Sequence, residues 1–150
     1  MRRFIALLML GLFLSGCATV GHLKTPSGRP EVFIEGATLE SATRSCANSL
    51  SSNGWEIEKV SDWTVQAITS TNSTMADFVF GTPGTNYKTW YRMVCRFSKE
   101  SNGVRVYATQ YLVSSRGTGF EQANELTSQK AYEGTQSWLE SIQNSIQHRR

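Results

Sequence analysis

Two long runs of alternating apolar and polar residues, joined by a short turn, constrain the fold of this chain more than any other feature. The first run covers residues 88–98 and the second covers residues 104–114, with the turn sequence KESNG between them. Alternation with a period of two is typical of β-strands that bury one face, and the short connection makes the strands antiparallel neighbours. We therefore expect a sheet built around this hairpin.

The phase of the alternation predicts which face of the hairpin belongs to the core. One phase collects mostly apolar side chains: Tyr91, Met93, Cys95, Phe97, Val104, Val106, Ala108 and Leu112. The other phase is mainly aromatic, basic and polar: Trp90, Arg92, Val94, Arg96, Arg105, Tyr107, Thr109 and Tyr111. Successive side chains of a strand point to opposite faces, so we expect the first set to be buried and the second to face solvent.

Other segments add strands to this hairpin. Residues 31–36, EVFIEG, alternate and predict a first strand, and residues 55–67 predict a second hairpin that turns near Ser61 and Asp62. Residues 71–87 hold the apolar run DFVF between loop-like ends, which is open to interpretation as a strand or as a hydrophobic flap. The expected sheet has four to six strands.

Two amphipathic segments predict helices. The first is capped by Thr38 and stops at Gly54, and the second runs from about residue 121 to residue 147. Their apolar positions recur at helical spacing: Leu39, Ala42, Cys46 and Leu50 in the first, and Ala131, Thr135, Trp138, Ile142 and Ile146 in the second. The predicted order is β-α-β-β-(β)-β-β-α, an α+β fold in which two helices cover one face of an antiparallel sheet.

The N-terminus indicates where the protein is located. Arg2 and Arg3 precede an apolar run at residues 4–13. A helix of that length rises about 15 Å, half the hydrocarbon thickness of a bilayer, so the segment is too short for a spanning anchor and is typical of an export signal. The next residues, Leu14-Ser15-Gly16-Cys17, resemble the lipobox of bacterial lipoproteins.

This resemblance implies that residues 1–16 are a signal peptide and that the Cys17 thiol receives a diacylglyceryl group. Since two or more acyl chains anchor a protein stably, the membrane would be a partner through lipidated Cys17. The next residue is Ala18 rather than the Asp that retains enterobacterial lipoproteins at the inner membrane, which points to the outer membrane and the periplasm. Residues 17–30 are then the lipid anchor and a flexible tether, and residues 31–147 are a single α+β domain. The alternative is an ordinary secretory signal with a chance cysteine.

The predicted element order is also similar to that of the helix-grip domains in the lipoprotein subunits of outer-membrane β-barrel assembly machinery. The likeness concerns the order of elements alone, without a shared sequence motif, and a fold does not determine a function.

Two cysteines remain after Cys17. Cys46 lies on the apolar stripe of the first helix and Cys95 on the core phase of the hairpin, so both thiols are expected in one core. An oxidising periplasm favours a disulfide between such a pair. Two buried thiols are the alternative, and the sequence leaves both open.

Charge and motifs argue against several function classes. The chain has 15 Lys+Arg against 12 Asp+Glu, and two of the arginines lie in the signal segment, so we expect no nucleic-acid partner. His22 and His148 lie outside the predicted domain, and the cysteines lack the CxxC spacing of zinc or redox sites. The carboxylates are scattered, and the glycines at 81–84 and 117–119 lack the Lys-Ser/Thr of a phosphate loop. We therefore expect a non-enzymatic protein without cofactor or metal.

The polar phase of the central hairpin is the candidate binding face. It combines aromatic rings with guanidinium groups, the residue types enriched at binding hot spots. The candidate residues are Trp90, Arg92, Arg96, Arg105, Tyr107 and Tyr111. The alternative is a half-solvated face whose cross-strand pairs only stabilise the sheet.

The function expected from these features is a lipid-anchored binding or assembly module that recognises an envelope protein or an envelope polymer. A periplasmic inhibitor or immunity lipoprotein against a hydrolase or toxin is one alternative. A small envelope hydrolase is the other.

Overall fold

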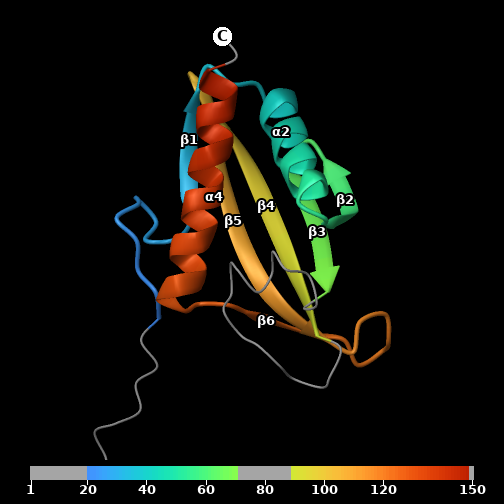
Figure 1. Cartoon of the computed structure of the whole chain (residues 1–150). Helices are drawn as coiled ribbons and strands as arrows, with labels where there is room; N and C mark the ends of the chain where they lie inside the picture. Colours follow the sequence, from blue (N-terminus) through green and yellow to red (C-terminus); the bar gives the residue numbers. More distant parts are fainter. Residues whose placement is uncertain (1–19, 71–88, 149–150) are drawn as a thin grey trace, which may run out of the picture.

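A computed structural model of the chain describes residues 20–70 and 89–148 (Figure 1). The described strands are β1 (Glu31–Glu35), β2 (Glu56–Ser61), β3 (Thr64–Ser70), β4 (Trp90–Glu100), β5 (Gly103–Ser114) and β6 (Gln122–Glu125). The helices are α2 (Leu39–Ser52) and α4 (Gln129–Gln147). All neighbouring strands are antiparallel, and the two helices lie on one face of the sheet, so the predicted α+β fold and element order are confirmed.

The strands lie in the order β1-β5-β4-β3-β2, with β6 also paired to β5. The central pair, β4 and β5, is the predicted hairpin, and its register places Cys95 opposite Ala108. Strand β1 pairs with residues 103–107 of β5, and β6 pairs with residues 111–114 of the same strand. β1 and β6 therefore share the edge of β5 that β4 leaves free.

The core lies between the sheet and the two helices, as the phase of the hairpin predicted. Tyr91, Met93, Cys95, Phe97, Val104, Val106 and Ala108 are all buried, together with Ala42, Cys46 and Leu50 of α2 and Leu139, Ile142 and Ile146 of α4. Leu112 is half-buried and packs against this cluster. The apolar phase of the central hairpin is thus the core face.

Helix α2 begins where the sequence predicted. The Thr38 side chain accepts a hydrogen bond from the Ser41 backbone N–H at 3.1 Å, and the Ser41 hydroxyl accepts one from the Thr38 N–H at 3.1 Å. This reciprocal capping satisfies two backbone donors that the first helical turn cannot pair. The helix stops before Gly54, whose φ of 79° is in the left-handed region that glycine adopts readily.

The second helix begins later than predicted. Residues 122–125, which we expected to be helical, form strand β6, and α4 starts after its N-cap Ser128, whose side chain accepts from the Ala131 N–H at 3.3 Å. β1 covers only part of the β5 edge, and pairing with the remainder satisfies the backbone of residues 122–125. The sixth strand therefore comes from this segment. The strand or flap predicted within residues 71–87 lies outside the described residues, which do not include residues 71–88.

The structure corrects the predicted tether over residues 21–30, which pack against the domain. The Gly21 N–H donates to the Thr127 carbonyl at 2.6 Å, and the His22 N–H donates to Oε1 of Gln129 at 2.9 Å. A Cβ at Gly21 would lie 2.9 Å from Cα of Gln129, so only glycine fits this approach. Residues 21–30 are therefore part of the packed structure, while the signal segment, residues 1–16, and Cys17 lie outside the described residues.

Side chains of α4 occupy the outer edge of β1. Oε1 of Gln136 accepts from the Glu31 N–H at 2.9 Å, and Nε2 of Gln143 donates to the Phe33 carbonyl at 2.7 Å. These backbone groups point away from β5 and would otherwise be free to pair with another strand. The opposite edge strand, β2, carries a register shift between Ile57 and Lys59. Within the described ranges, no helix combines the length and the apolar character needed to cross a membrane.

Candidate functional site

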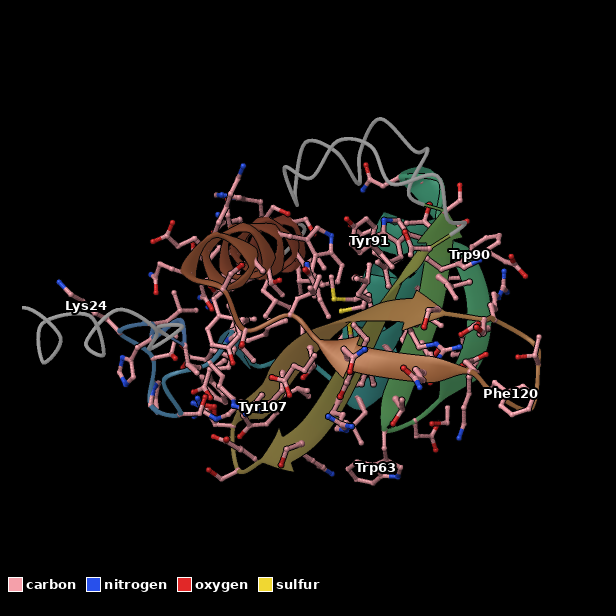
Figure 2. The ribbon with its side chains drawn as sticks, turned by 90° about the horizontal axis from the view of Figure 1, so that it is seen from below. Lys24, Trp63, Trp90, Tyr91, Tyr107 and Phe120 are labelled. Carbon is pink, nitrogen blue, oxygen red and sulfur yellow. The ribbon has the colours of Figure 1, made fainter. Side chains whose placement is uncertain are left out.

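The sheet face that points away from the helices, here called the outer face, carries all six residues of the predicted binding face. The register puts Arg92 opposite Tyr111 and Arg96 opposite Tyr107, while Trp90 and Arg105 belong to the same phase of their strands. Figure 2 shows Tyr107 on this side of the sheet. The six residues nevertheless have very different surroundings.

Arg92 lies in a group of paired charges, the arginine–glutamate cluster, which consists of Arg92, Arg116, Glu56, Glu58 and Glu121. Nε of Arg92 is 2.9 Å from Oε2 of Glu58, and Nη1 is 2.9 Å from Oε1 of Glu121. Nη2 of Arg116 lies 3.2 Å from Glu58 and 3.3 Å from Glu56. The Arg92 side chain is only 15% exposed. It is therefore engaged within the protein.

The pKa values of the cluster follow from these contacts. Burial by itself would raise the pKa of the Glu58 carboxyl, but hydrogen bonds from Gln66 and Arg92 and the charges of Arg92 and Arg116 outweigh it and lower that pKa. Burial likewise opposes the charged form of Arg92, while hydrogen bonds with Glu58 and Glu121 raise the pKa of its guanidinium. These contacts thus favour the charged forms of Glu58 and Arg92.

Trp90 is partly exposed, as Tyr107 is, but its ring is covered from within the protein: the guanidinium of Arg116 lies over it, 4.6 Å from the ring centroid. The outer face here also contains buried apolar side chains: Ile68, Val94 and Val113. Trp90 therefore contributes to a second, smaller apolar layer on the outer face, beneath the arginine–glutamate cluster.

Arg105 also makes its contacts within the protein. Its Nε lies 2.6 Å from Oε1 of Glu100, its Nη1 lies 3.2 Å from Oε1 of the buried Glu31, and its guanidinium lies over the Phe33 ring. The hydrogen bond with Glu100 is the main reason that the pKa of Arg105 is raised. This arginine joins β1 to β5 and compensates a buried carboxylate.

Arg96 differs from the other arginines of the outer face. Its side chain is exposed and makes no ion pair or hydrogen bond with any residue in the described ranges. It lies opposite the half-exposed Tyr107 on β5 and opposite Thr64 on β3. Of the three predicted arginines, only Arg96 is available to a partner.

Trp63, which was not among the predicted site residues, lies in the turn next to the part of β4 that carries Arg96. The Trp63 carbonyl accepts from the Phe97 N–H at 3.0 Å, and the Trp63 side chain is 54% exposed on the side of the outer face (Figure 2). By simple alternation Trp63 would share the inward phase of the buried Val65, but it sits in the turn between β2 and β3, where alternation does not apply. We name Trp63, Arg96 and Tyr107 the binding patch.

Cys46 and Cys95 meet in the core as predicted. Both are free thiols with no exposed surface. A hydrogen bond with Cys46, together with complete burial, raises the pKa of the Cys95 thiol well above its ordinary value. A thiol in this state is a poor nucleophile. The disulfide between them stays a prediction.

A separate depression lies at the end of the sheet, around the β4–β5 turn. Its volume is about 770 Å³, and its lining includes Glu35, Lys99, Glu100 and Asn102. The Glu35 carboxylate accepts from Nδ2 of Asn102 at 3.0 Å, and Glu100 is paired with Arg105. Its carboxylates are thus engaged with neighbouring side chains.

Across residues 20–70 and 89–148, no three His, Cys, Asp or Glu side chains gather in a way that could hold a metal ion. No protein-family model matches the chain, and no curated protein matches it. The candidate site therefore rests on the geometry of the outer face.

Proposed function

We propose that the protein is a lipid-anchored protein of the outer membrane that faces the periplasm, and that its domain is a non-enzymatic binding module. The anchor is supported by the resemblance of Leu14-Ser15-Gly16-Cys17 to a lipobox. The binding function is supported by the binding patch on the outer face.

The observation that carries the binding function is the contrast among the arginines of the outer face. Arg92 and Arg105 have carboxylate partners within the protein, whereas Arg96 has no ion pair or hydrogen bond with the described residues, so its five guanidinium N–H donors can serve another molecule. The exposed tryptophan on the neighbouring β2–β3 turn adds a large apolar contact area. The partner is therefore an envelope protein or envelope polymer that presents an anionic group next to an apolar surface.

The binding patch can be tested by site-specific photo-crosslinking in living cells. A photoreactive amino acid replaces Trp63, and a matched control places it at Ser137, an exposed residue of α4 on the helix side. We expect a discrete adduct from position 63 that is absent from position 137. Arg96→Glu in the same chain should abolish the adduct while it changes the free energy of unfolding by less than about 0.5 kcal/mol, as surface substitutions usually do.

Two crosslinking results would contradict the proposal. The same adduct from both positions, or an adduct from position 63 that survives Arg96→Glu, contradicts a role for the binding patch. The identity of the crosslinked molecule then separates an assembly partner from a hydrolase or toxin that the protein inhibits.

A further inference from the structure

The loop at residues 115–121, between β5 and β6, holds a phenylalanine away from the protein. Phe120 is 85% exposed, more than the other exposed large apolar residues in the described ranges, Val20, Val60 and Trp63. In Figure 2 the Phe120 ring lies at the outer margin of the molecule, on the loop. Packing against the described residues therefore does not explain a phenylalanine at this position.

Hydrogen bonds within the loop fix its conformation. The Thr118 N–H and hydroxyl both donate to the Ser115 carbonyl, at 3.2 and 2.7 Å, and the Phe120 N–H donates to the Thr118 hydroxyl at 3.1 Å. The Gly117 N–H donates to the Glu121 carboxylate at 3.0 Å. The exposure of Phe120 is thus built into an ordered loop.

The charged side chains of the loop point back toward the sheet. Arg116 pairs with Glu56 and Glu58, and Glu121 pairs with Arg92. The tip of the loop consists of Thr118, Gly119 and Phe120, none of which is charged. A tip with no charge and one projecting aromatic ring suits the interface between lipid headgroups and acyl chains.

The N-terminal chain reaches the domain at the same end of the molecule. Gly21 is fixed against Thr127, which follows β6, and the salt bridge between Arg29 and Glu125 joins the next part of the chain to β6 itself. Figure 1 shows β6 and residue 20 at one end of the molecule and the C-terminus at the other.

The packing of residues 21–30 leaves a very short connection to Cys17. Four residue steps from Cys17 to Gly21 span at most about 14 Å, even when fully extended. The tether expected from the sequence, residues 17–30, would have allowed several times that distance. Val20, 65% exposed, lies within this short connection, and Lys24 is exposed just beyond it.

We infer that this end of the domain contacts a phospholipid bilayer and that Phe120 inserts into the lipid interface. The inference rests on the proposed lipidation of Cys17 and adds a fixed orientation to it. Phe120 provides a second contact away from the acylated cysteine, and α4 runs away from the membrane. Two separated contacts restrict the rotation of the domain, whereas a single lipid anchor would let it rotate freely.

The orientation can be tested with the full-length lipidated protein in vesicles of phosphatidylethanolamine and phosphatidylglycerol. A fluorophore is attached at Gly119→Cys, where a Cβ meets no atom within 4 Å and Phe120 is retained. The matched control carries it at Ser101→Cys, an exposed position in the β4–β5 turn at the opposite end. Cys46 and Cys95 are fully buried and stay unlabelled in the native protein. Nitroxide lipids then report contact with the bilayer.

We expect nitroxide lipids to quench the fluorophore at position 119 and to leave the fluorophore at position 101 unchanged. Phe120→Asp in the Gly119→Cys chain should remove the quenching while the protein still floats with the vesicles. Equal emission at both positions in a protein that floats would overturn the orientation and leave the anchor standing. A protein that does not float, and whose mass shows no lipid on Cys17, would overturn the anchor and the orientation together.

Discussion

Replacing Arg92 by alanine should destabilise the domain far more than replacing Arg96, although the two arginines lie on the same face of the same strand. Arg92 makes two contacts of 2.9 Å with carboxylates, whereas Arg96 makes none with the described residues. A hydrogen bond to a charged group contributes about 1.5–3 kcal/mol when buried, and an exposed ion pair about 0–1 kcal/mol. The side chains of Arg92 and Glu58 are 15% and 18% exposed, so these contacts lie between the two limits.

We therefore expect Arg92→Ala to lower the free energy of unfolding by about 2 kcal/mol and Arg96→Ala to change it by less than about 0.5 kcal/mol. Urea denaturation of residues 20–150 measures both values under the same conditions. A double-mutant cycle with Glu58→Gln isolates the pairwise part of the effect, because residues in contact give non-additive changes.

The loss of unfolding free energy caused by Arg92→Ala should also depend on pH. The pKa of Glu58 in the folded protein lies below its ordinary value of 4.5, so its ionised form stabilises the fold at neutral pH. That stabilisation is complete above the ordinary pKa and is lost as the pH falls through the lower, folded-state pKa. The gap between the wild-type protein and Arg92→Ala should narrow over that acidic range. Equal costs for Arg92→Ala and Arg96→Ala at pH 7 would refute the assignment of the arginine–glutamate cluster as a structural element.

Three further predictions concern the anchor and the core. Cys17→Ser should abolish incorporation of labelled palmitate and leave uncut precursor, and continued labelling would refute the lipobox interpretation. If an oxidising periplasm joins Cys46 and Cys95, the disulfide closes about fifty residues and stabilises the fold by roughly 4 kcal/mol; two alkylated thiols in the intact mass of the unreduced protein would show that the pair stays reduced, as in the structure. Gln110→Leu should stabilise the domain by about 1 kcal/mol, because its buried amide has no hydrogen-bond partner among the described residues; a lower melting temperature would show that the amide is paired.

The sequence predicted those parts of the fold that depend on local pattern. The phase of residues 88–114 identified the core side chains, because alternation on a central hairpin has only one way to bury its apolar set. The cap at Thr38 was predicted for a similar reason, since its partner Ser41 lies within the same turn. These features depend on neighbours close in sequence.

The features that the sequence missed depend on contacts between distant segments. Trp90 is half-buried because Arg116, from the loop after β5, lies over its ring. Strand β6 forms because β1 leaves part of the β5 edge open, and Gly21 is fixed by Thr127 from the opposite end of the chain. Alternation and spacing carry no information about such partners. For the same reason Arg92, Arg96 and Arg105 were indistinguishable in the sequence.

The two glutamines of α4 that occupy the edge of β1 have a consequence for crowding on a membrane. Under the proposed anchoring, neighbouring copies are confined to a surface and meet at a raised effective concentration, which favours lateral aggregation through open strand edges. A neighbouring strand would first have to displace Gln136 and Gln143 from β1. The other unpaired edges of the described sheet belong to β2, with its bulge and charged side chains, and to the four-residue β6. None of these described edges offers a long, flat template, so under the proposed anchoring they would not promote strand pairing between neighbouring copies.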